Sequence, residues 1–165
     1  MQYMDDLRLQ PLDPVVDLEL YRIAYNWRST PKRHTSAPQL PFEAFTEINP
    51  THLTIGLFNG DLLAIYFLRE WEPTKYEAHF TSKRGVPRET LLLGAKAILN
   101  LMLDNGATEV AALILPTNRP LRQFVTELGM TKESHVIFTC ITETQGGSIE
   151  QRNKRPVFIK YVKRS

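Results

Sequence analysis

Alternating apolar and polar residues predict several β-strands along the chain. Residues 52–71, HLTIGLFNGDLLAIYFLREW, hold two strand-like runs on either side of Asn59-Gly60, and Asn-Gly is a strong hairpin turn. Lys75–Thr81 alternates strictly, which places Tyr76, Ala78 and Phe80 on one face and Glu77, His79 and Thr81 on the other. Further strands are predicted at residues 7–12, 108–115, 135–143 and 156–163.

Four segments carry helical patterns. Asp13-Pro14 is a typical helix start for a segment through Trp27, and a short helix follows from Pro41. The segment from Pro87 to the C-cap Gly106 is apolar nearly all round, which predicts a helix buried against a sheet. A fourth helix is predicted from Asn118 to Leu128, where Gly129 ends it.

These elements predict the order β-α-α-β-β-β-α-β-α-β-β. The strand–helix–strand step in the middle implies a parallel pair of strands, and the hairpins on either side imply antiparallel pairs. We therefore expect an α/β fold with a mixed central sheet and helices on both faces. The 165 residues suggest one domain, with residues 144–155 as a long loop in the C-terminal hairpin.

Composition is ordinary for a globular protein, with 42% hydrophobic and 23% charged residues. No apolar run is long enough to span a membrane, and no secretory signal is visible, so a cytoplasmic location is expected. Cys140 is the only cysteine, which excludes internal disulfides and cysteine metal clusters. No metal ligands are predicted from the sequence.

Positive charge gathers at the C-terminal end. Residues 152–165 hold six basic side chains and no acidic one, so the rest of the chain carries 14 basic and 18 acidic residues. This end could contact an acidic protein or nucleic acid, or it could be a solvated edge strand that lysines protect from pairing. Nucleic-acid binding is the weakest of these readings because only Phe158 and Tyr161 could stack on bases.

The stretch KRGVPRETLLLGAKAIL, residues 83–99, leads a basic loop into a helix. Backbone N–H groups at a helix N-terminus bind anions, and glycine lets a phosphate approach closely. Pro87 supplies no N–H group and Glu89 adds a negative charge, so both weaken such a site. Lys83, Arg84 and Arg88 could compensate by pairing with phosphate, or they could be solvated loop charges.

Glu77 and His79 share one face of their predicted strand. An imidazole beside a carboxylate can accept a proton from an amine, so the two residues are candidates for a catalytic base. The alternative is that they are ordinary polar residues on a half-exposed strand.

The order of elements resembles that of the GNAT acetyltransferase superfamily over almost the whole chain. The segment NRPLRQFVTELGM is similar to the family's pattern of an Asn after the fifth strand, a helix and a closing Gly. The resemblance implies acetyl-CoA as cofactor and an N-acetyltransferase activity, with Glu77 and His79 as catalytic residues. It implies these cofactor-binding residues: Phe80, Arg84, Gly85, Arg88, Asn118 and Phe124.

Two departures from the family pattern predict impaired catalysis. Pro87 and Glu89 stand where the family prefers glycine, so acetyl-CoA binding is expected to be weak or absent. Val125 stands where many members carry a tyrosine that protonates the leaving thiolate, and it cannot donate a proton.

The sequence is also similar to phage-encoded GNAT-fold proteins, including small head-assembly proteins of short-tailed phages. The shared features are the EAHF strand, the incomplete glycine loop and the PTNRPLRQFVTELGM segment. This second resemblance implies a structural or assembly component of a virion that contacts other proteins, with the C-terminal hairpin as part of the contact. An active N-acetyltransferase with a variant loop is the alternative.

Overall fold

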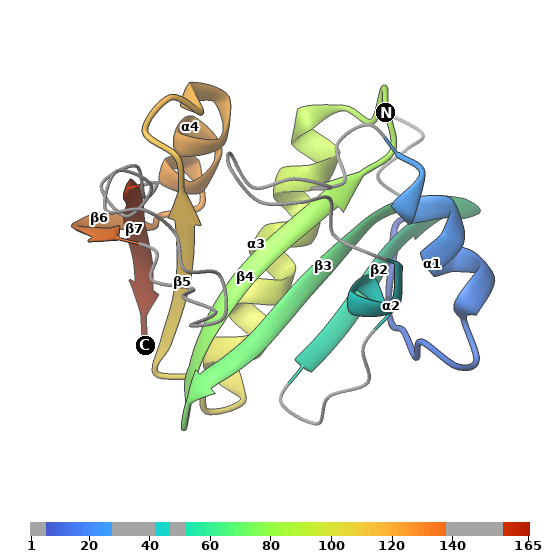
Figure 1. The fold of residues 1–165 in the computed structure, drawn as a ribbon, viewed down its shortest axis with the longest axis horizontal. Helices are drawn as coiled ribbons and strands as arrows, with labels where there is room; N and C mark the ends of the chain where they lie inside the picture. Colours follow the sequence, from blue (N-terminus) through green and yellow to red (C-terminus); the bar gives the residue numbers. More distant parts are fainter. Residues whose placement is uncertain (1–5, 28–41, 47–51, 138–156) are drawn as a thin grey trace, which may run out of the picture. The chain divides into compact units, whose positions relative to one another are not determined.

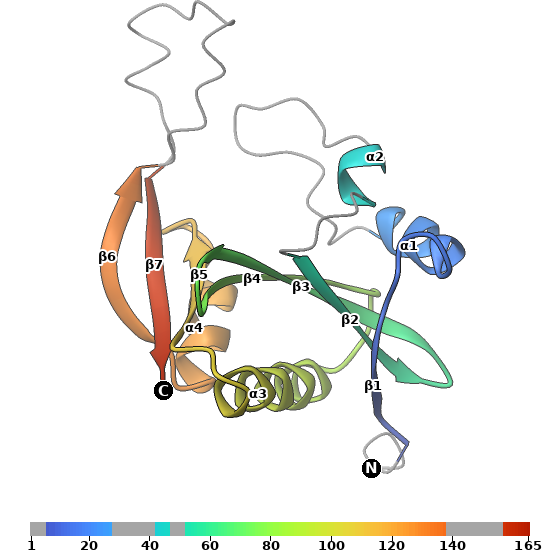
Figure 2. The same cartoon turned by 90° about the horizontal axis from the view of Figure 1, so that it is seen from below.

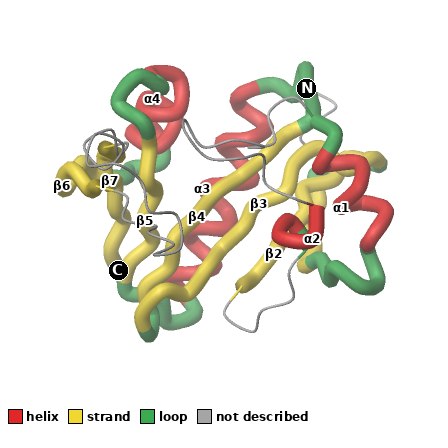
Figure 3. Tube along the Cα trace, viewed as in Figure 1, coloured by secondary structure: helices red, strands yellow, loops and turns green. Residues whose placement is uncertain are grey.

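The computed structural model describes residues 6–27, 42–46, 52–137 and 157–165. The elements are β1 (Arg8–Pro11), α1 (Leu18–Tyr25), α2 (Phe42–Phe45), β2 (His52–Asn59), β3 (Asp61–Glu72), β4 (Lys75–Ser82), α3 (Arg88–Asp104), β5 (Glu109–Ile114), α4 (Arg119–Glu127), β6 (Thr131–Ile137) and β7 (Val157–Arg164). Their order confirms the predicted one, and the fold is mixed α/β (Figures 1 and 3). The predicted loop at 144–155 and Cys140 lie outside the described residues.

The chain forms two compact units, Met1–Val110 with Arg164–Ser165, and Ala111–Lys163. The expected single domain stays a prediction, and each unit is described by itself. No helix in the described part of the chain is long and apolar enough to cross a membrane.

The first unit is built on antiparallel strands in the order β1-β2-β3-β4. The predicted hairpin turn at Asn59-Gly60 is confirmed, with Gly60 at a φ of 71°, where glycine meets no steric penalty. Within this unit α3 lies on one face of the strands and α1 and α2 lie over the other (Figure 2). The two faces therefore have separate sets of neighbours.

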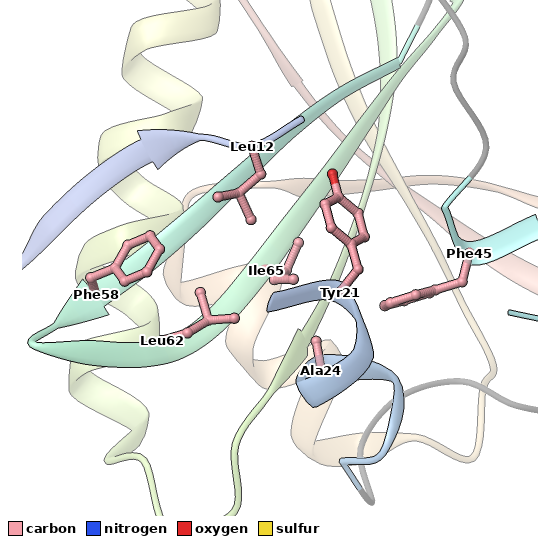
Figure 4. Packing of buried hydrophobic residues seen from close by; sticks show 7 residues of the cluster. All are labelled: Leu12, Tyr21, Ala24, Phe45, Phe58, Leu62 and Ile65. Atoms are coloured by element: carbon pink, nitrogen blue, oxygen red, sulfur yellow. The ribbon is translucent and has the colours of Figure 1, made fainter. Parts of the chain in front are cut away.

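The face under α1 and α2 is an apolar core rich in aromatic rings. Tyr21 and Ala24 of α1 pack with Phe45 of α2 and Ile65 of β3 (Figure 4). Leu12, Phe58 and Leu62 complete the buried cluster. Phe45 also meets Phe67 of β3 with ring centroids 5.3 Å apart, so α2 is held to the sheet through aromatic contacts.

The opposite face is covered by α3. The helix buries one side: Thr90, Leu91, Gly94, Ala95, Ile98, Leu99 and Met102. Gly94 is needed there because a Cβ at this position would lie 2.6 Å from the hydroxyl of Tyr66 on β3. The expectation that this helix is buried against a sheet is confirmed, although two of its apolar residues, Leu93 and Leu101, are exposed on the outer side. One buried stripe is enough to bind a helix to a sheet.

A β-bulge near the tip of the β3–β4 hairpin fixes how these two strands meet. Glu72 pairs with Lys75, but Glu70 pairs with Tyr76, so Trp71 is the extra residue. Beyond the bulge Arg69 pairs with Glu77 and Phe67 pairs with His79. If Trp71 were paired opposite Tyr76 in a regular ladder, Arg69 would stand opposite Ala78, on the other face of the sheet.

The second unit contains α4 and the antiparallel pair β6–β7. Asn118 caps α4 as predicted, because its side chain accepts a hydrogen bond from the Leu121 N–H at 3.3 Å. The predicted strand at 135–143 begins earlier, at Thr131, and its residues after Ile137 lie outside the described part. Sequence patterns missed this start because residues 131–134 are all polar and exposed, as suits a strand at a sheet edge.

The C-terminal strand does not lie at the edge of the sheet. The strand order in this part is β5-β7-β6, so β6 is the outer strand and β7 lies between two neighbours. The interpretation of residues 156–163 as an edge strand, either solvated or open to another chain, is therefore wrong for β7. Its aromatic residues Phe158 and Tyr161 are buried, which also removes the two rings considered for base stacking.

Candidate active site

Glu77 and His79 lie side by side on β4, as their spacing predicts. Strand pairing places both on the face that carries Ile65 and Phe67 of β3, away from α3. The Nε2 atom of His79 lies 2.9 Å from Oε1 of Glu77, which is hydrogen-bond distance. The strand therefore joins the two predicted catalytic residues into a carboxylate–imidazole pair.

Arg69 of β3 is a third member of this group, and sequence reasoning missed it. Its guanidinium donates to Oε2 of Glu77 at 2.7 Å, so each carboxylate oxygen has its own partner. The pairing depends on the bulge at Trp71, which no local pattern predicts. Arg69 is the one basic residue in the strand from Asp61 to Glu72, and that was the only signal that could have drawn attention to it.

The three side chains differ in their access to solvent. The side chain of Glu77 is 13% exposed, whereas those of Arg69 and His79 are 54% and 50% exposed. The carboxylate is thus enclosed by its two partners, and the imidazole and guanidinium face outward. His52 of β2 pairs with Arg69 across the sheet and extends this polar row.

The hydrogen bond from His79 lowers the pKa of Glu77 below its ordinary value, and the charges of His79 and Arg69 act in the same direction. Partial burial opposes them, but its effect is smaller than the combined effect of the partners. Glu77 is therefore ionised at neutral pH. A carboxylate with a lowered pKa and two occupied oxygens is a weak base, which argues against Glu77 as the direct proton acceptor.

The loop after β4 and the start of α3 contain the residues expected to bind a phosphate group. Gly85 has a φ of 88°, and a Cβ there would meet nothing within 4 Å. Lys83, Arg84 and Arg88 are all exposed. The loop therefore presents positive charge in open surroundings.

Pro87 occupies the N-cap position of α3, one residue before the first helical turn in which it was expected. Its missing N–H group therefore precedes the helix and removes no donor from the first turn. The Pro87 carbonyl accepts hydrogen bonds from Thr90 and Leu91 at 3.0 and 3.3 Å. Glu89 is exposed in this turn, so its carboxylate is the feature that most opposes an anion here.

Phe80 lies on the opposite face of β4 from the Glu77–His79 pair. Its ring contacts Tyr66 with centroids 5.8 Å apart, on the side covered by α3. Phe80, Arg84, Gly85 and Arg88 thus belong to the first unit together with the pair, but Phe80 is held in the packing under α3.

Asn118 and Phe124 belong to the second unit. Asn118 is the N-cap of α4 and Phe124 is buried on that helix, so both have a structural role there. Val125 is buried as well and, being apolar, cannot serve as an acid. The described residues contain no group of three or more His, Cys, Asp or Glu side chains able to hold a metal ion.

No family model matches the sequence, and no curated protein matches it. Solved structures do match the fold. An N-acetyltransferase from Staphylococcus aureus Mu50 is 14% identical with a TM-score of 0.73, covering 96% of this chain and 97% of its own. The ribosomal-protein-S18-alanine N-acetyltransferase from Escherichia coli is 14% identical with a TM-score of 0.66, covering 94% and 92%.

A GNAT-family acetyltransferase from Streptococcus pneumoniae is also similar, with 14% identity, a TM-score of 0.66 and coverage of 96% and 98%. Identities this low establish the fold alone. They agree with the element order that suggested the family from the sequence. This chain has the GNAT fold of N-acetyltransferases.

Proposed function

We propose that the protein transfers an acetyl group from acetyl-CoA to an amine. The observation that carries the proposal is the 2.9 Å contact between Glu77 and His79 on β4. It gives a chain with an acetyltransferase fold a side-chain pair able to take a proton from an amine.

The loop from Lys83 to Glu89 supports acetyl-CoA as the donor. It combines exposed basic side chains, an open glycine and a helix N-terminus that no side chain caps. These features suit the pyrophosphate of the cofactor. Glu89 works against it, so the expectation of weakened binding stands as a prediction.

Acetyl-CoA supplies the acetyl group as a thioester, so that a C–N bond to the amine forms as the C–S bond breaks. An ammonium substrate must lose a proton before its nitrogen can attack, and an amine that attacks in the neutral form loses a proton after the C–N bond has formed. In this chain His79 accepts that proton, while Glu77 stabilises the imidazolium that results. No described residue on α4 replaces the missing tyrosine, so the leaving thiolate takes its proton from solvent.

A structural role in a phage particle stays a prediction without support from the described residues. The acetyltransferases named above give no sign of a virion location. Contact with protein partners through the C-terminal hairpin also stays a prediction, but β7 cannot accept a further strand because it already has two neighbours.

Two measurements test the proposed function. Calorimetry with acetyl-CoA should show binding to the wild-type protein and equal binding to His79→Gln. Thiol release in the presence of a panel of primary amines should be measurable for the wild type and at least about a hundredfold slower for His79→Gln. Absence of acetyl-CoA binding, or equal turnover by the two proteins, would overturn the proposal.

A further inference from the structure

Arg69 and His79 each contact a different oxygen of the Glu77 carboxylate. Arg69 holds Oε2 of Glu77 at 2.7 Å, and His79 holds Oε1 at 2.9 Å. Because the Glu77 side chain is largely enclosed, rotating it away would leave a partly buried charge without partners. The geometry therefore fixes which oxygen faces the imidazole.

The charge of Glu77 fixes the hydrogen positions on His79. An ionised carboxylate can only accept hydrogen bonds, so Nε2 of His79 must carry the proton in their contact. In the neutral imidazole the lone pair then lies on Nδ1. No hydrogen bond to Nδ1 exists among the described residues, and the ring is half exposed, so this atom is available to a substrate.

We infer that Arg69 is a positioning residue that holds Glu77 in place, so that His79 presents Nδ1 as the proton acceptor. The inference rests on the proposed acetyl transfer and names the atom that takes the proton from the amine. Arg69 itself does not contact the substrate in this role.

A simple surface ion pair is the alternative explanation for Arg69. Exposed ion pairs contribute little to stability, and the guanidinium is more than half exposed. Arg22 and Glu19 on α1 are such a pair, 3.6 Å apart and both largely exposed. The difference at Arg69 is that its partner is enclosed and bound to an imidazole. Removing Arg69 should therefore change the pKa of Glu77 and its hydrogen bond with His79. It should have little effect on the free energy of unfolding.

The titratable and charged groups on this face of the sheet are few among the described residues. His52 lies across from Arg69 on β2, Glu77 and His79 lie on β4, and Tyr21 reaches the face from α1. Nearer the hairpin tip, Lys75 of β4 and Glu72 of β3 lie on the same face and form their own ion pair at 3.6 Å. Glu77 is the carboxylate that Arg69 and His79 contact. A carboxyl titration assigned to Glu77 therefore reports directly on its two partners.

The test compares the full-length wild type with Arg69→Met and with the control Arg22→Met. Carboxyl ¹³C resonances give the titration of Glu77, and long-range ¹H–¹⁵N correlations give the protonated nitrogen of His79. In the wild type and the control, Glu77 should titrate below its ordinary range and Nε2 should carry the proton. In Arg69→Met the titration midpoint of Glu77 should move up and the Nε2–H signal should lose its hydrogen-bonded shift.

A second arm uses turnover. Arg69→Met should lower kcat for amine acetylation about tenfold while KM for acetyl-CoA stays unchanged, and Arg69→Lys should recover part of the loss. If the Arg69→Met spectra match those of the wild type, the inference is overturned whatever the activity. If those spectra change as expected but the wild type shows no turnover, the positioning contact stands and the proposed function fails.

Discussion

The hydroxyl group of Tyr66 donates a 2.8 Å hydrogen bond to the carbonyl oxygen of Leu91, which ties β3 to α3. Both groups are buried, and burial raises the pKa of the Tyr66 hydroxyl well above its ordinary value of 10.0, so the phenol stays protonated. Tyr66→Phe removes the donor but keeps the ring. We expect the free energy of unfolding to fall by about 1–2 kcal/mol, measured by urea denaturation.

Gly94→Ala should be destabilising although alanine is the better helix former. The new Cβ would lie 2.6 Å from the Tyr66 hydroxyl oxygen and 3.1 Å from Leu57, so the contact outweighs a propensity gain of about 1 kcal/mol. Because phenylalanine lacks that oxygen, the cost of Gly94→Ala should be smaller in a Tyr66→Phe background. Strictly additive effects in this double-mutant cycle would contradict the contact.

The stability of the protein should depend on Glu77 at acidic pH. The pKa of Glu77 is lowered in the folded state from an ordinary value of 4.5, so its contribution is complete above that value and is lost as pH falls through the folded pKa. Glu77→Gln removes this contribution. The difference in unfolding free energy between wild type and Glu77→Gln should therefore be larger at pH 7 than near pH 3. A difference that stays constant with pH would show that Glu77 has no lowered pKa.

Asn118→Ala should destabilise the protein by about 0.5–2 kcal/mol, because the side chain caps α4 through the Leu121 N–H. Asn118→Ser keeps an oxygen that can cap the helix, so its stability should stay close to that of the wild type. Thermal denaturation followed by circular dichroism measures both. If the two variants are equally destabilised, the role of Asn118 is not capping.

Glu89→Gln should strengthen acetyl-CoA binding roughly two- to fivefold. The carboxylate lies exposed in the first turn of α3, where it neutralises the helix dipole that would attract phosphate. Glu19→Gln is the matched control, because Glu19 lies in the first turn of α1. Calorimetry at low salt gives both affinities, and an unchanged affinity in Glu89→Gln would place the cofactor phosphates elsewhere.

Local chemistry explains why much of the fold could be predicted from the sequence. The turn at Asn59-Gly60 and the cap at Asn118 each depend on residues within a few positions of one another. The start of β6 was missed because an exposed strand needs no apolar alternation, and only its pairing with β7 reveals it.

Of the candidate site, Glu77 and His79 could be predicted from the sequence, but Arg69 could not. Glu77 and His79 are two residues apart on one strand, so alternation alone places them together. Arg69 contacts Glu77 across two neighbouring strands. This contact depends on the register of β3 against β4, which cannot be predicted from local sequence patterns. Pro87 was placed one residue too far into α3, within the ordinary uncertainty of helix boundaries.

The unpaired residue Trp71 sets the register of β4 against β3, and so decides which face of the sheet each β4 side chain occupies. If Trp71 instead paired opposite Tyr76, Arg69 would stand opposite Ala78, and each side chain of β4 would exchange faces relative to β3. Glu77 and His79 would turn toward α3, and Phe80 would leave Tyr66. Whether one residue at the tip of a hairpin is paired or unpaired therefore decides whether this surface carries an acid–base pair or a phenyl ring, without any change to the residues involved.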